Sequence, residues 1–130
     1  MPMYEALIEH AKQARMQAYT PYSHFNVGAA VRTRSGKIFQ GCNIENSSYG
    51  ATICAERVAL FQAYAHGERE IEALAIVADT PTPCPPCGIC RQVIVELAGD
   101  IDVILVNLRN ERRLFRASEL LPEAFTAAFF

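Results

Sequence analysis

The sequence lacks the features of a membrane protein or a nucleic-acid-binding protein. No run approaches the roughly 18 consecutive apolar residues of a transmembrane helix, and the N-terminus has no apolar core of signal-peptide length. The formal net charge is −2, from 12 basic and 14 acidic residues, so no basic field favours nucleic acid or an anionic membrane. The arginine-rich segment 109–116 is expected to be a solvated turn and strand edge or a subunit contact. We therefore expect a cytoplasmic protein with no nucleic-acid or membrane partner.

Cysteine is present in an odd number. The five residues are Cys42, Cys54, Cys84, Cys87 and Cys90. Cytoplasmic thiols stay reduced, and an odd count does not suit a full set of disulfides. The cysteines therefore indicate metal binding or catalysis rather than a disulfide framework.

The hydrophobic pattern predicts one domain over residues 1–130, since no linker or internal repeat divides the chain. Helices are predicted at 3–19, 54–66 and 87–98 with a short one beginning at 118, and strands at 25–33, 37–46, 71–79 and 101–108. Thr52 is the predicted N-cap of the second helix. The largely apolar 71–79 suits the middle of a sheet. This order of elements predicts an α/β fold with helices on both faces of one sheet.

The spacing of three cysteines in TPCPPCGICRQ (82–92) favours one pair as metal ligands. Because Pro86 favours a helix start, Cys87 and Cys90 fall in a first helical turn. At i and i+3 they lie roughly 5–6 Å apart, which suits one tetrahedral ion. Two prolines hold Cys84 in an extended segment, about 9 Å from Cys87. Cys84 is therefore predicted to stand outside the metal site.

A further ligand and a carboxylate are expected from the segment ICAER (53–57). Cys54 begins the second predicted helix, and Cys87 and Cys90 lie at the start of the third. If these two helix starts meet at one ion, they hold it with three thiolates. Glu56, two residues on, lies on another side of that turn and can stand beside the ion without binding it. A carboxylate next to a metal-activated water suits proton transfer. Alternatively, Glu56 is a solvated first-turn carboxylate, and an isolated cysteine such as Cys42 is only a small hydrophobic residue.

Several motifs carry a resemblance to a known family. CAE (54–56) with PCGICRQ (86–92) resembles the zinc-dependent nucleoside and nucleobase deaminases. PYSHFNVGAA (21–30), GCNIENSSYGATICAER (41–57) and ELLPEAF (119–125) are similar to the small cytidine deaminases. The resemblance implies a three-layer α/β/α sandwich with one mixed sheet of about five strands. It also implies one Zn²⁺ per subunit on Cys54, Cys87 and Cys90, because no histidine occupies a ligand position.

The resemblance implies hydrolytic deamination of cytidine and 2′-deoxycytidine in pyrimidine salvage, with attack of activated water at C4. Glu56 is then the catalytic proton carrier. Three thiolates on Zn²⁺ leave a net negative charge, which Arg57 is expected to offset by a hydrogen bond to sulfur.

Substrate-binding roles also follow from the resemblance. It places Phe25 against the pyrimidine and the backbone of Ala55 on the base. Asn43 and Glu45, on one side of an extended segment, are expected at the ribose, where the carboxylate would repel a phosphate. Homotetramers of the family share their active sites, and Tyr49 and Phe125 match the shared positions. The apolar tail that contains Phe125 suits an interface, and packing within the chain explains it nearly as well.

Two other functions are considered. A blasticidin-type deaminase shares the CAE and PCGxCRQ elements, whereas FNVGAA and NIEN favour the nucleoside enzyme. A purely structural zinc module would use Cys84 as its fourth ligand. Cys84 and Pro85 depart from the residues common in the family, which bears on the shape of the loop before Cys87.

Overall fold

The computed structural model describes residues 2–130 and contains one five-stranded mixed sheet. The strand order is β2-β1-β3-β4-β5, and only β3 and β4 run parallel. The strands are β1 (Val27–Thr33), β2 (Ile38–Cys42), β3 (Ile71–Ala78), β4 (Asp102–Val106) and β5 (Arg112–Arg116). The predicted α/β class and the mixed sheet are confirmed.

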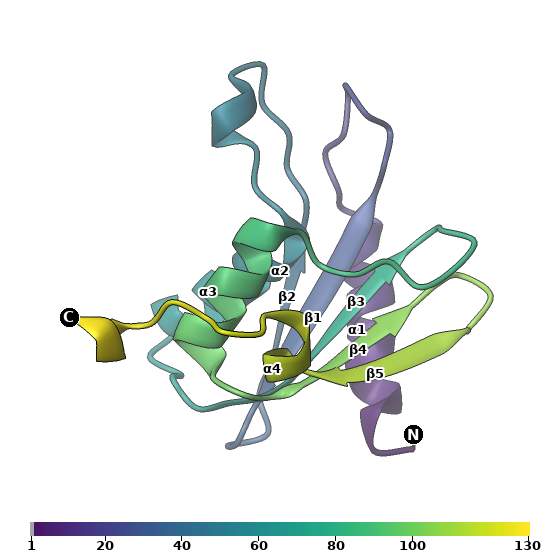
Figure 1. The fold of residues 1–130 in the computed structure, drawn as a ribbon. Coiled ribbons are helices and arrows are strands. Elements are labelled where there is room, and N and C mark those ends of the chain that lie inside the picture. Colours follow the sequence, from purple (N-terminus) through teal and green to yellow (C-terminus); the bar gives the residue numbers. More distant parts are fainter. Residues whose placement is uncertain (1) are drawn as a thin grey trace.

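Helices cover both faces of this sheet (Figure 1). α1 (Glu5–Arg15) packs on one face, while α2 (Ala55–Ala65) and α3 (Gly88–Ala98) pack on the other. Four short elements complete the chain: η1 (Pro2–Tyr4), η2 (Tyr49–Ala51), α4 (Ala117–Leu120) and η3 (Ala127–Phe129). Each face has its own hydrophobic cluster, one beneath α1 and one beneath α2 and α3. The three-layer arrangement is therefore confirmed.

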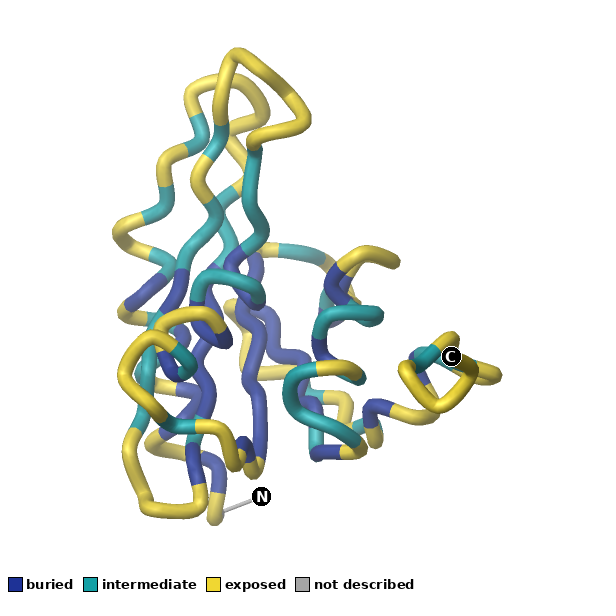
Figure 2. Tube along the Cα trace, turned by 90° about the vertical axis from the view of Figure 1, so that its left-hand side faces the viewer, coloured by how far each residue is buried: buried dark blue, intermediate teal, exposed yellow. Residues whose placement is uncertain are grey.

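The sheet forms the buried centre of the molecule (Figure 2). All residues of the central strand β3 except Glu72 are buried, as expected for an apolar strand with helices on both faces. At the edge, β5 follows a turn at 107–110 and carries exposed arginines. Arg112 pairs with Glu5, and Arg116 pairs with Asp102. The arginine-rich segment is thus a turn and an edge strand, and its charges are partly paired within the chain.

Two glycines let helices approach the strands closely. A Cβ atom at Gly28 in β1 would lie 2.0 Å from the carbonyl oxygen of Ala11 in α1. A Cβ atom at Gly41 in β2 would lie 2.4 Å from both the Ala55 oxygen and the Ala59 nitrogen in α2. Real side-chain carbons do not approach so closely, so these positions require glycine. Gly41 fixes the depth at which the start of α2 lies on the sheet.

Several predicted boundaries were wrong. The first helix ends at Arg15 rather than near residue 19, because the backbone of Tyr19 bonds instead to Asn43 and Glu45. The N-cap of α2 is Cys54 and not Thr52, whose hydroxyl accepts a hydrogen bond from the Asn46 backbone. The predicted strand ends were also too long, since β2 stops at Cys42 and β4 at Val106.

The segments 16–26 and 43–54 project together beyond one end of the sheet (Figures 1 and 2). Isolated bridges tie Tyr19 to Ile44 and Ile44 to Ile53. Both segments are mostly exposed at their tips. Over the described residues, no helix has the length and apolar character needed to cross a membrane.

Candidate metal centre

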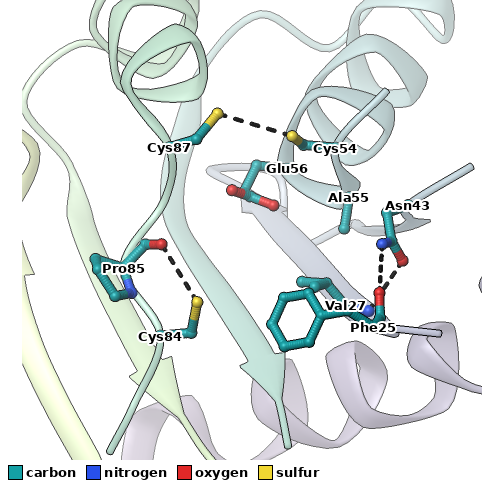
Figure 3. Close-up of a pocket in the computed structure, with 9 residues that line it drawn as sticks. All are labelled: Phe25, Val27, Asn43, Cys54, Ala55, Glu56, Cys84, Pro85 and Cys87. Carbon is teal, nitrogen blue, oxygen red and sulfur yellow. Dashed lines mark hydrogen bonds between the residues drawn. The ribbon is translucent and has the colours of Figure 1, made fainter. Parts of the chain in front are cut away.

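Three cysteine sulfurs converge where α2 and α3 begin. Cys54 is the N-cap of α2, Cys87 is the N-cap of α3, and Cys90 lies in the first turn of α3. The three Sγ atoms lie within 4.8 Å of one another, and those of Cys54 and Cys87 are 3.8 Å apart (Figure 3). Sulfurs about 2.3 Å from a tetrahedral zinc ion are themselves about 3.8 Å apart. The donor set and its spacing therefore fit Zn²⁺.

The backbone explains why these sulfurs meet. Cys54 and Cys87 have extended φ and ψ angles, as N-cap residues do, so the chain turns into a helix at each. α3 follows the carboxyl end of β3, and α2 packs beside α3. The positive ends of both helix dipoles and their free N–H groups favour thiolate sulfur. The cysteines thus lie where negative charge is stabilised.

Hydrogen bonds shift the pKa values of two of these thiols in opposite directions. The bond with Cys90 and the bond from Arg57 lower the pKa of Cys54 to about 5, against the opposing effect of its burial. The bond between the two cysteines raises the pKa of Cys90. The Arg57 Nη2 atom lies 3.6 Å from the Cys54 sulfur, as expected for a group that offsets thiolate charge.

Glu56 is a buried carboxyl group beside the sulfurs. Only 4% of the residue is exposed, and its side chain projects between the cysteines and Phe25 (Figure 3). Burial, with a smaller contribution from the charge of Cys54, raises the pKa of Glu56 from 4.5 to about 7. A carboxyl group with this pKa can both accept and release a proton near neutral pH.

These groups face a cavity of about 170 Å³. Cys54, Glu56 and Cys87 lie at one end, and Phe25, Val27, Asn43 and Ala55 line one side. Cys84 and Pro85 line the opposite side. The volume is below the roughly 300–1,000 Å³ of sites for drug-sized ligands. The cavity therefore suits a single small ring.

Comparison with protein families agrees with this chemistry. The family model described as the cytidine and deoxycytidylate deaminase zinc-binding region matches residues 1–106. The chain belongs to this family. The family model describes a zinc-binding region, and the three cysteines of this chain form a set of ligands that suits zinc.

Individual deaminases are similar over nearly the whole chain. A cytidine deaminase of Halalkalibacterium halodurans is 55% identical over 124 residues, which cover 95% of this chain and 94% of that protein. One of Sporosarcina psychrophila is 52% identical and covers 94% and 90%. The crystal structure of cytidine deaminase from Burkholderia pseudomallei superimposes with a TM-score of 0.92 at 52% identity, covering 94% of this chain and 98% of that chain.

In this deaminase-family chain, the residues predicted to bind substrate are only partly brought together. Phe25, Asn43 and Ala55 line the cavity, whereas Glu45 does not. Asn43 already accepts a hydrogen bond from the Val27 N–H and donates one to the Phe25 carbonyl. Glu45 accepts bonds from the backbone N–H groups of residues 22 and 23. Both side chains therefore hold the 20–27 segment in place.

Tyr49 and Phe125 lie outside the cavity of their own chain. They are 79% and 63% exposed. The Phe125 ring stacks on Phe129 and Phe130 in a tail that extends away from the sheet (Figure 1). The tail aromatics thus contact one another and remain open to solvent, so packing within the chain does not bury them.

Sequence reasoning missed the contributions of four residues to the site. Val27 lines the cavity without having been singled out. Pro85 lines it although it was noted only for the shape of the loop before Cys87, and Cys84 lines it although predicted only to stand outside the metal cluster. Arg91 donates to the carbonyl oxygens of Pro86 and Leu120, which ties the cysteine turn to α4. The signal for Arg91 was its place in PCGICRQ, where it follows Cys90. No sequence pattern indicated which side of the cavity Cys84 would face.

Proposed function

We propose that this protein catalyses zinc-dependent hydrolytic deamination of cytidine and 2′-deoxycytidine, yielding the uridine product and ammonia, in pyrimidine salvage. The observation that carries the proposal is the buried carboxyl group of Glu56, which faces the same small cavity as Cys54 and Cys87, two of the three convergent cysteines. The names of the relatives and the extent of their similarity support the substrate.

In the proposed site, Cys54, Cys87 and Cys90 hold one Zn²⁺ per subunit. Bound zinc supplies a Lewis acid that makes water nucleophilic near neutral pH. Cys84 takes no part in binding it, because its sulfur lies outside the cluster. Three protein ligands would suit a catalytic zinc ion, whereas a structural module needs a fourth protein ligand.

Glu56 moves the protons of the reaction. It accepts one proton of the attacking water and passes it to N3 of the ring, and it then takes the second proton from the new hydroxyl group on C4 and delivers it to the departing amine. A pKa near 7 makes both forms available during one cycle. Arg57, through its contact with the Cys54 sulfur, would offset the negative charge of the thiolates that hold the zinc.

The pyrimidine is proposed to lie against Phe25 and the backbone of Ala55, both of which line the cavity. Asn43 and Glu45 are assigned to the ribose. In the free chain these two side chains bond to the 20–27 backbone, so part of that role is to shape the sugar end of the site. A hydrogen bond from the Ser23 hydroxyl is the chief cause of the lowered pKa of Glu45. The Glu45 side chain therefore stays negatively charged, and this charge disfavours a phosphorylated substrate.

We propose that residues 1–130 form a single deaminase domain that assembles as a homotetramer in the cytoplasm. Tyr49 and Phe125 are assigned to the active sites of neighbouring subunits. The support is their exposure, together with the solvent-facing tail aromatics. Five free cysteines suit a reducing compartment.

The test of this function is a panel of substrates incubated with the zinc-loaded protein. Cytidine, 2′-deoxycytidine, cytidine 5′-monophosphate, cytosine and blasticidin S are each scored for released ammonia and for the loss of cytosine absorbance. We expect rapid turnover of the two nucleosides and little of the others. Preferred turnover of the monophosphate or of blasticidin S would contradict the proposed substrate.

A further inference from the structure

Cys84 and Pro85 form a cavity wall that the proposed chemistry does not use. They lie in the extended segment between β3 and α3. In Figure 3 they face the cavity from the side opposite Phe25 and Asn43. The half-buried Cys84 thiol donates to the Pro85 carbonyl oxygen at 3.6 Å. The sulfur is outside the metal cluster, so it is free to contact a bound ring.

The reaction constrains how a pyrimidine ring enters this cavity. The carbon that is attacked, C4, must lie at the end that holds the cysteines and Glu56. N3 and C5 are its two neighbours in the ring. N3 and the adjacent O2 accept hydrogen bonds, whereas the C5–C6 edge presents only C–H groups. The two edges therefore need walls of different chemistry.

The two sides of the cavity differ in this respect. Glu56 and the backbone of Ala55 come from the start of α2 and provide the polar groups for the N3 edge. Pro85 has no N–H group. Burial raises the pKa of the Cys84 thiol, and a neutral thiol is only a weak donor. The Cys84 and Pro85 wall is thus suited to a C–H edge.

We infer that Cys84 faces C5 of the bound pyrimidine and determines which C5 substituents the site accepts. The inference rests on the proposed deamination, since it uses the position of C4. Cys84→Ala removes the sulfur and opens space beside C5. Cys84→Val adds a second branch there and narrows the same space.

The experiment measures kcat/KM for cytidine and for 5-methylcytidine with zinc-loaded protein. One methyl group in an apolar pocket changes discrimination by about tenfold. We therefore expect Cys84→Ala to raise the ratio of 5-methylcytidine to cytidine about tenfold and Cys84→Val to lower it by a similar factor. Cys42→Ala, which removes a thiol outside the cavity, should leave the ratio at the parent value.

Zinc content and circular dichroism are recorded for each variant, so that a folding defect in one still leaves the other as a test. If the parent is active and a folded, zinc-loaded Cys84 variant has the same ratio of 5-methylcytidine to cytidine kcat/KM as the parent, this inference alone is overturned. A zinc-loaded parent that does not deaminate cytidine overturns the proposed function and this inference with it.

Discussion

A methyl group placed at Gly41 would test how the sheet positions α2, the helix that carries Glu56. The new Cβ atom would lie 2.4 Å from the Ala55 oxygen and the Ala59 nitrogen, and 3.0 Å from the Ala59 Cα atom. Ordinary contact begins at 3.4 Å, so α2 must move outward by about 1 Å. Cys54 and Glu56 lie at the start of α2 and would move with it.

Two effects of Gly41→Ala are expected. Overpacking of this kind costs about 1–3 kcal/mol of unfolding free energy, which in a domain of this size lowers Tm by about 3–5 °C for each kcal/mol. A misplacement of about 1 Å can reduce the rate about 100-fold. We therefore expect kcat/KM for cytidine to fall by about two orders of magnitude, with weaker retention of zinc.

Gly28→Ala is the matched control, because it creates a clash at least as severe on the other face. Its Cβ atom would lie 2.0 Å from the Ala11 oxygen and 2.5 Å from the Arg15 nitrogen, both in α1. Denaturant unfolding should show a similar loss of stability, while kcat/KM of the zinc-loaded protein stays near the parent value. The reasoning is refuted if Gly41→Ala keeps full activity, or if both variants lose activity equally.

Three further predictions concern the site itself. Arg57→Ala should weaken zinc binding and lower kcat/KM about 10- to 100-fold, as measured by chelator competition and turnover, whereas the exposed Arg34→Ala should do neither. Glu56→Gln should abolish turnover and stabilise the fold. The pKa of Glu56 is 4.5 in the unfolded chain and about 7 in the folded protein. Ionisation of Glu56 therefore destabilises the native state as the pH rises from 4.5 to about 7. The gain from Glu56→Gln in denaturant unfolding should grow between pH 5 and pH 8 to about 3 kcal/mol at most, and a constant gain would contradict this. Cys87→Ser should lose zinc by atomic absorption while Cys84→Ser retains one ion per chain, and equal losses would show that Cys84 is a ligand.

Much of the layered fold follows from local sequence patterns. The apolar run at 71–79 indicates a central strand, and apolar residues at helical spacing locate the first and third of the three long helices. The end of the first helix did not follow, because it depends on backbone bonds between Tyr19 and a segment more than 20 residues away. Such pairing is tertiary and leaves no local signal.

The metal centre was predictable because its signal is geometric. Cys87 and Cys90 lie within one helical turn, and Cys54 begins another helix. The cavity walls were less predictable. Asn43 and Glu45 hold the 20–27 segment only because distant loops meet there. The side of the cavity that Cys84 faces likewise depends on how these loops meet.

The most direct test of the proposed mechanism compares the zinc-loaded parent with zinc-loaded Glu56→Gln in an ultraviolet assay of cytidine deamination. Zinc content is measured on the same samples. The proposed mechanism predicts that both proteins bind one zinc ion per chain, that the parent converts cytidine to uridine and ammonia, and that the variant has lost nearly all turnover. Equal activity in the two proteins, or no turnover by the fully loaded parent, would contradict it.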